Sequence, residues 1–222
     1  MGQMITLKRP DEGGLDAYVS QVDKGRPSVI VIQEWWGLND HIKSIVDRLD
    51  SEGFNALAPD LFHGRVTRDA DEASHLMSGL DFPGAVHQDI AAALAYLKSI
   101  NPKVAVMGFC MGGALTLASA ARLEGFFAGV CFYGVPPKAF ADPADIKIPI
   151  QGHFATQDDW VTPAIVAEIT RSMTATGNPP EVYSYVADHA FFNATRPEVY
   201  NKDAAELAFE RTLAFLRAKH RG

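Results

Sequence analysis

The sequence predicts an α/β protein, a three-layer α/β/α sandwich around a mostly parallel sheet. Runs of continuous apolar and β-branched residues alternate along the chain with amphipathic segments of helical period. This alternation is typical of a sheet that helices cover on both faces. The 222 residues contain no repeat, low-complexity tract or linker, so we expect residues 1–222 to form a single domain.

The first quarter of the chain is expected to supply one edge of the sheet and its first parallel strands. Residues 4–9 and 15–22 resemble an antiparallel hairpin added at that edge. Residues 28–35, SVIVIQEW, form an apolar β-branched run typical of a buried strand. A helix is predicted over residues 40–54, where apolar residues recur at helical spacing, and a short strand over residues 55–61.

The rest of the chain continues the alternation up to its end. The patterns predict helices over residues 84–100, 111–123, 163–177 and about 197–219, and strands over residues 103–109, 126–134, 148–155 and 181–187. Ligands of such sheets bind beyond the carboxyl ends of the strands. We therefore expect Glu34, Cys110, the loop at 156–159 and the loop at His189 to share one edge of the sheet, since each follows a predicted strand.

Composition excludes several classes of protein. The formal charge of −7 argues against a nucleic-acid partner. No apolar stretch approaches the ~18 residues of a membrane span, and the first residues are too polar for a signal peptide. The two cysteines, Cys110 and Cys131, form no disulfide framework, and no close pair of metal ligands occurs. We expect a cytoplasmic protein without metal or cofactor, either a monomer or a small homo-oligomer.

Cys110 lies in a glycine cluster, GFCMGG, between a predicted strand and a predicted helix. The form Gly-x-nucleophile-x-Gly is typical of a sharp strand-to-helix turn that lifts the central side chain clear of the sheet. The first amides of the following helix then face the same space. A cysteine packed in a glycine-rich turn is the alternative, whereas the spacing lacks both the phosphate-loop and the dinucleotide-binding patterns.

The residues after the next two strands supply partners for this thiol. In hydrolases with this turn, the triad runs nucleophile, acid, histidine along the chain. Asp158 and Asp159 follow one predicted strand, and His189 follows the next. Order and position predict that His189 is the base and Asp158 the acid that orients it, with Asp159 as the competing assignment.

The motifs QEWWG, GFCMGG, DDWVTP and DHAFFNATRP resemble those of the dienelactone hydrolases, from about residue 30 to residue 216. The resemblance implies an α/β-hydrolase fold with Cys110 as nucleophile, His189 as base and Asp158 as acid. It also implies that Glu34 lies beside the resting thiol and takes its proton when an anionic substrate arrives. The backbone amides of Trp35 and Met111 would form the oxyanion hole.

The sequence departs from the family where a substrate carboxylate is expected to bind. Enzymes acting on dienelactone are expected to hold that carboxylate with two arginines. Here Asn193 stands four residues after the histidine, with Arg196 the nearest arginine, and the earlier stretch Asp69–Glu72 is acidic, although Arg65 and Arg68 precede it. The residues expected to contact a substrate are Trp36, Tyr133, Trp160, Phe191 and Arg196.

The sequence therefore predicts a cofactor-independent cysteine hydrolase of carboxylic esters or lactones. One alternative keeps the chemistry but changes the substrate, giving a general short-chain esterase or thioesterase that does not act on dienelactone. A second alternative is a thiol-sensing binding protein that keeps only the fold. The natural substrate does not follow from the sequence.

Overall fold

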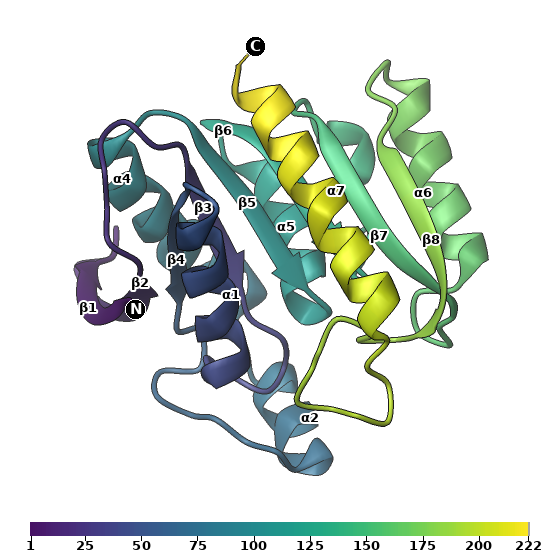
Figure 1. Cartoon of the computed structure of the whole chain (residues 1–222), viewed down its shortest axis with the longest axis horizontal. Coiled ribbons are helices and arrows are strands. Elements are labelled where there is room, and N and C mark those ends of the chain that lie inside the picture. The colour runs from purple at the N-terminus through teal and green to yellow at the C-terminus, as the bar shows by residue number, and fades with distance from the viewer. Residues whose placement is uncertain (222) are drawn as a thin grey trace.

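The computed structural model describes residues 1–221, whose strands form one eight-stranded sheet. The strand order is β1-β2-β4-β3-β5-β6-β7-β8 (Figure 1). The bounds are β1 Gln3–Lys8, β2 Gly14–Val19, β3 Ser28–Ile32, β4 Asn55–Pro59, β5 Val104–Phe109, β6 Phe126–Phe132, β7 Ile150–Gln157 and β8 Glu181–Asp188. Strands β3 to β8 pair in parallel, while β1 and β2 form the antiparallel edge. The predicted fold class is confirmed.

Helices cover both faces of the sheet, as the continuous apolar strands require (Figure 1). Helices α1 (Asp40–Ser51) and α7 (Lys202–His220) pack on one face. Helices α4 (Ala91–Ile100), α5 (Met111–Arg122) and α6 (Pro163–Ala175) pack on the other. Alternate strand residues supply the two cores: Val29 and Val31 face α1, whereas Ile30 and Ile32 face the side of α4 and α5.

The helices of the structure differ from the predicted ones in three places. The last helix begins at Lys202 instead of residue 197, because the Arg196 carbonyl accepts from the amides of Val199 and Tyr200 in a separate turn. Helix α2 (Ala70–Ser78) lies in a stretch for which the sequence patterns predict no helix. The helix predicted over residues 84–100 is divided into α3 (Phe82–Gly84), a π-helical segment Ala85–Ile90 and α4.

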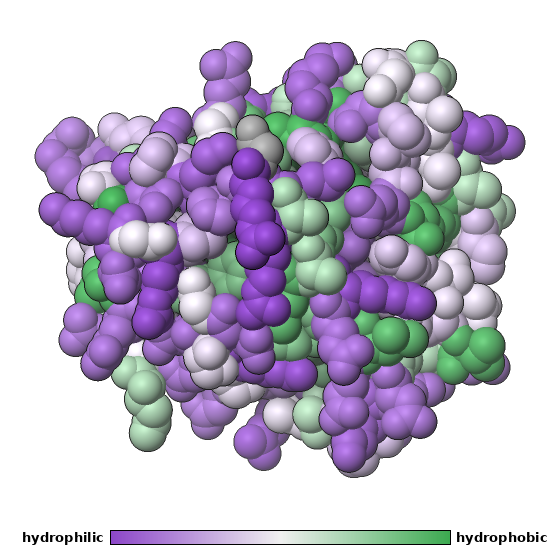
Figure 2. Space-filling model, turned by 45° about the horizontal axis from the view of Figure 1, so that its top comes forward, coloured by the Kyte–Doolittle hydropathy of each residue, from purple (hydrophilic) through white to green (hydrophobic). Residues whose placement is uncertain are grey.

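The face that carries the end of α7 is largely hydrophilic. Figure 2 shows polar side chains over most of it, with hydrophobic side chains visible in separate areas between them. Along residues 1–221, no helix is both long and apolar enough to cross a membrane.

The parallel strands bring distant residues to one edge of the sheet. Glu34 follows β3, Cys110 follows β5, Asp158 follows β7 and His189 follows β8. All four strands run in the same direction, so these residues gather at the carboxyl edge, as the topology predicts.

Candidate active site

Cys110 occupies the sharp turn between β5 and α5. Its φ of 54° and ψ of −115° place a non-glycine residue in the positive-φ region, where an L-residue is strained. The turn is held on both sides: the Cys110 amide donates to the Phe132 carbonyl over 3.0 Å, and the Cys110 carbonyl accepts from Ala114 over 3.1 Å. The backbone therefore fixes the direction of the thiol, which is partly exposed.

Two positions near Cys110 must be glycine, because neighbouring backbone atoms lie where a Cβ atom would be. A Cβ atom on Gly112 would lie 2.4 Å from the Ile32 carbonyl oxygen, and one on Gly134 would lie 2.2 Å from the Cys110 carbonyl oxygen. Neither backbone neighbour can move without disturbing the central strands. The glycine cluster in the sequence thus follows from the packing of α5 against β3 and β6.

Asp158 and His189 form the hydrogen bond that the sequence predicts. Asp158 Oδ2 lies 2.7 Å from His189 Nδ1. The other carboxylate oxygen, Oδ1, accepts from the amides of Trp160 and Val161 over 2.8 and 2.9 Å. Asp159 is exposed and makes no such bond in the described chain. The geometry favours Asp158 over Asp159 as the residue that orients the imidazole.

These contacts lower the pKa of Asp158 and raise that of His189, so both groups are stabilised in their charged forms. Burial alone would raise the pKa of Asp158, but its bonds to His189 and to the two amides lower it overall. Burial would likewise lower the pKa of His189, yet the bond to Asp158 and the neighbouring Cys110 sulfur raise it to about 10. The imidazole is therefore stabilised in its protonated form.

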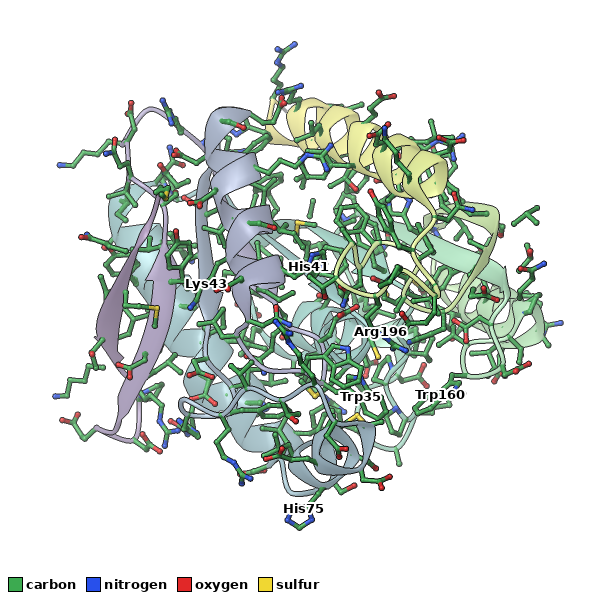
Figure 3. The ribbon with its side chains drawn as sticks, turned by 60° about the horizontal axis from the view of Figure 1, so that its bottom comes forward. Trp35, His41, Lys43, His75, Trp160 and Arg196 are labelled. Atoms are coloured by element: carbon green, nitrogen blue, oxygen red, sulfur yellow. The ribbon has the colours of Figure 1, made fainter. Side chains whose placement is uncertain are left out.

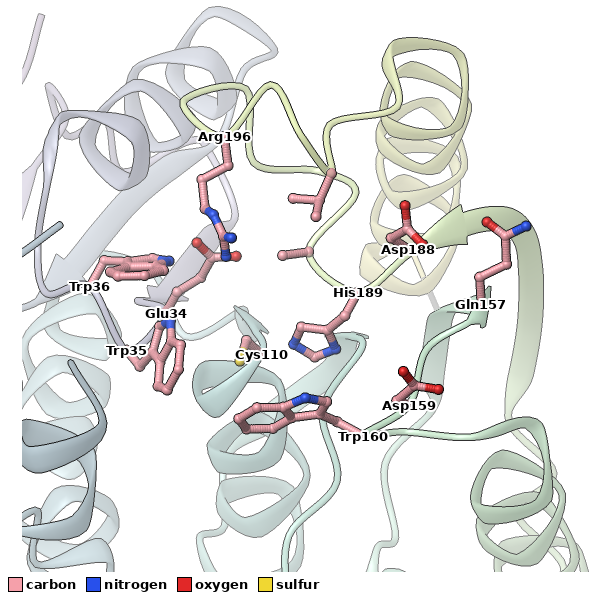
Figure 4. Close-up of a pocket in the computed structure, with 12 residues that line it drawn as sticks. Glu34, Trp35, Trp36, Cys110, Gln157, Asp159, Trp160, Asp188, His189 and Arg196 are labelled. Atoms are coloured by element: carbon pink, nitrogen blue, oxygen red, sulfur yellow. The ribbon is translucent and has the colours of Figure 1, made fainter. Parts of the chain in front are cut away.

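The second ring nitrogen of His189 is directed at the reactive side of the site. His189 Nε2 is buried and has no hydrogen-bond partner within residues 1–221, and the imidazole stands beside Cys110 (Figure 4). The indole of Trp160 stacks on this ring, with centroids 5.9 Å apart and planes at 27°. Asp158, His189 and Cys110 thus follow one another in a line from the buried carboxylate to the thiol.

Glu34 is a buried carboxylate in the wall of the same cleft. Its side chain is 1 % exposed. The Tyr133 hydroxyl donates to Oε1 over 3.2 Å, and Asn193 Nδ2 donates to Oε2 over 2.5 Å. Burial raises the pKa of Glu34 to about 6, although both hydrogen bonds and the charges of His189 and Arg196 oppose the shift.

The cleft has a volume of about 380 Å³. Of the residues expected to contact a substrate, Trp36, Trp160 and Arg196 line the cleft. Tyr133 and Phe191 do not line it, because both are fully buried in the core. Tyr133 instead contributes to the site through Glu34. The remaining lining residues are Glu34, Trp35, Cys110, Gln157, Asp159, Asp188, His189, Ala190 and Val199.

The backbone amides of Met111 and Trp35 belong to different elements of the site. Met111 is the first residue of α5, so its N–H has no acceptor inside the helix. Trp35 follows β3 across the cleft. Neither amide has an acceptor elsewhere in residues 1–221, which suits the oxyanion role that the family resemblance implies.

Asn193 has a role that the sequence did not indicate. In the sequence, Asn193 stands only where the family resemblance leads us to expect an arginine. In the structure it is fully buried and holds Glu34, while its own Oδ1 accepts from the Thr195 amide and hydroxyl over 3.0 and 2.7 Å. Its only sequence signal is its place four residues after His189. Along residues 1–221, no cluster of three or more His, Cys, Asp or Glu side chains is arranged to bind a metal.

Comparison with known proteins indicates the family of this chain. The protein named usf of Aquifex pyrophilus is 34 % identical over 228 residues, covering 98 % of each chain. Carboxymethylenebutenolidase 1 of Cupriavidus pinatubonensis is 28 % identical, covering 92 % of each chain. A dienelactone hydrolase-like promiscuous phosphotriesterase from metagenomic libraries superposes with a TM-score of 0.87 at 24 % identity, covering 98 % of each chain.

The family model for dienelactone hydrolases matches residues 15–220, which span every strand of the sheet except β1. The family match and the sequence similarity show that this chain belongs to the dienelactone hydrolase family, whose members hydrolyse ester and lactone bonds.

Proposed function

We propose that this chain hydrolyses carboxylic esters or lactones through an acyl-cysteine intermediate, with Cys110, His189 and Asp158 as its triad. The observation that carries the proposal is the 2.7 Å bond between Asp158 and His189, together with an unpartnered Nε2 beside a thiol on a strained turn. This is the nucleophile, base and orienting acid of acyl transfer.

Glu34 is the second base of the proposal. Its pKa of about 6 leaves it ionised at neutral pH, so it can accept the Sγ proton once a substrate displaces it from Tyr133 and Asn193. His189, with its pKa raised to about 10, retains a proton for the leaving group. The thiolate attacks the carbonyl carbon, and the amides of Trp35 and Met111 stabilise the oxyanion.

The remaining steps return every proton. The tetrahedral intermediate collapses, the carbon–oxygen bond breaks, and the leaving alkoxide takes the His189 proton. Water then attacks the acyl-cysteine and gives one proton to His189. The acid departs, and the thiolate recovers its proton from Glu34.

The matched pair Cys110→Ala and Cys131→Ala tests this proposal. Turnover of 4-nitrophenyl acetate should fall to background in the first variant and persist in the second, because Cys131 is buried in β6. Mass spectrometry should detect a transient acyl adduct on Cys110. Retained turnover in Cys110→Ala would refute the proposal. Peroxide-dependent oxidation of Cys110 without turnover would instead support a thiol sensor.

A general short-chain esterase or thioesterase is the second candidate for the substrate class. The observation that favours it is Asn193, a neutral amide that binds Glu34 where an arginine would meet a substrate carboxylate. Turnover of a neutral aryl acetate should then exceed that of a small anionic lactone. The reverse preference would assign this chain to dienelactone itself.

A further inference from the structure

Trp160 is a large apolar residue that the fold leaves 60 % exposed in the wall of the cleft. Its backbone is nevertheless fixed, because the Trp160 amide donates to Asp158 Oδ1 over 2.8 Å and the next residue, Val161, is buried. Figure 3 shows Trp160 beside Trp35, and the centroids of the two indoles are 5.7 Å apart. An exposed tryptophan on a fixed backbone adds little to the core, so its place is explained by what its ring contacts.

The indole of Trp160 covers the His189 imidazole. The two rings are stacked, with centroids 5.9 Å apart and planes at 27°. The ring of Tyr133 contacts the same imidazole with centroids 5.1 Å apart and planes at 61°. Because Tyr133 is fully buried and Trp160 is exposed, the imidazole lies between an aromatic ring of the core and an aromatic ring at the surface.

The hydrogen bond to Asp158 holds only one edge of the imidazole. Nδ1 of His189 is bound, whereas Nε2 has no partner within residues 1–221. A ring held at one nitrogen can still tilt, and a tilt would move Nε2 away from the leaving group. Packing against the faces of the ring opposes that motion, and among the aromatic rings of the described chain Tyr133 and Trp160 supply it.

The stack also suits the charge that His189 carries. Its pKa is raised to about 10, so the ring is a cation at neutral pH, and a cation over the negative face of an indole is attracted to it. The other titratable or charged groups around the ring are Asp158, Glu34, Cys110 and Tyr133, with Asp159, Asp188 and Arg196 in the lining of the cleft. A substitution at position 160 leaves all of these in place and changes the aromatic contact alone.

We propose that Trp160 is a positioning residue of this site: its indole holds the His189 ring in place and stabilises the positive charge on it, so that Nε2 donates its proton to the leaving group. This proposal rests on the proposed function and adds to it a residue outside the triad. In that scheme the thiol proton goes to Glu34, so the attack of the sulfur does not need the His189 proton. The indole therefore acts at the step in which the carbon–oxygen bond breaks and the leaving alkoxide is protonated.

Two acetate esters with different leaving groups isolate this step. 4-Nitrophenolate leaves without a proton, whereas ethoxide must receive one. Trp160→Leu, which keeps an apolar cover on the imidazole, should lower kcat/KM for ethyl acetate by about tenfold or more, a part of the ~10²- to 10⁴-fold that a general acid contributes. For 4-nitrophenyl acetate the loss should be about threefold at most, since that leaving group needs no general acid. Trp160→Phe keeps an aromatic face and should recover most of the activity toward ethyl acetate.

Trp36→Leu is the matched control, because Trp36 lines the same cleft but its ring contacts Trp35 and Arg196. It should lower kcat/KM for both esters by similar factors. Equal losses for the two esters in Trp160→Leu, or a larger loss for the aryl ester, would make the indole a contact for the substrate and overturn the proposal. Urea unfolding should give Trp160→Leu nearly the stability of the unmodified protein, because the indole is exposed.

Titration of the His189 ring by NMR tests the contact without any turnover. The ring signal is assigned by its loss in His189→Gln. Trp160→Leu should lower the pKa of His189 by about 0.5, the size of a cation–π contact at an exposed site, and Trp160→Phe should lower it less. An unchanged pKa overturns the proposal, and so does a raised one, which would mean that the indole acts only by excluding water. A lowered pKa in a protein that hydrolyses neither ester supports the contact and refutes the proposed function alone.

Discussion

Glu34→Gln should make the protein more stable at neutral pH, because Glu34 is a carboxylate held in the core. Its pKa of about 6 in the folded state exceeds the ordinary value of 4.5. The folded protein therefore binds this proton more tightly than the unfolded chain does, and stability falls as pH rises through the interval. At 1.36 kcal/mol for each pKa unit, this interval corresponds to about 2 kcal/mol.

The substitution removes this titration and preserves the local contacts. A glutamine at position 34 can accept from Asn193 Nδ2 through its oxygen and donate its amide to the Tyr133 oxygen, since a phenol both donates and accepts. The variant should thus gain about 2 kcal/mol relative to the unmodified protein between pH 4 and pH 7.5. Measuring the change with pH cancels effects of the substitution that do not depend on pH.

Urea unfolding at a series of pH values measures this quantity. Glu210→Gln is the matched control, because Glu210 is an exposed glutamate on α7. The free energy of unfolding of this variant should differ from that of the unmodified protein by the same amount at every pH. Parallel stability curves for Glu34→Gln and the unmodified protein would refute the assigned pKa. The same variant should lose most ester turnover, since it removes the proposed acceptor of the thiol proton.

Two further substitutions test the geometry of the site. Asp158→Asn should lower kcat/KM for a neutral aryl ester by about 10³-fold or more, since the imidazolium loses its charged partner; Asp159→Asn should change it little, and equal losses would contradict the assignment. Gly112→Ala should destabilise the fold by about 3 kcal/mol or more, measured by urea unfolding, because its Cβ would lie 2.4 Å from the Ile32 carbonyl oxygen. Gly14→Ala, with its nearest contact at 3.5 Å, should cost far less.

The parallel part of the fold could be predicted because each buried strand is a continuous apolar run. The same pattern placed Cys110, Asp158 and His189 at strand ends, and parallel topology brought those ends together. Helix α2 was not predicted, because its sequence lacks an apolar stripe. Only Ala73 and Leu76 of this helix are buried. The final helix begins late because Asn201 caps it, accepting from Ala204.

The surroundings of Glu34 could not be predicted, because they depend on long-range contacts between polar side chains. Tyr133 lies 99 residues from Glu34 along the chain, and Asn193 lies 159 residues from it. No local pattern encodes either contact. The aromatic residues near strand ends showed the same limit: periodicity could not separate Phe191, which fills the core, from Trp160, which is 60 % exposed over the cleft.

The backbone around Cys110 separates what can be redesigned in this protein from what cannot. The side chain at position 110 points out of the turn. Exchanging its sulfur for oxygen therefore alters reactivity and requires no change in the surrounding backbone. Its small neighbours, including Gly112 and Gly134, leave no space for even one added methyl group. Engineering of new reactivity should therefore vary the nucleophile and the cleft walls, and leave the supporting turn as it is.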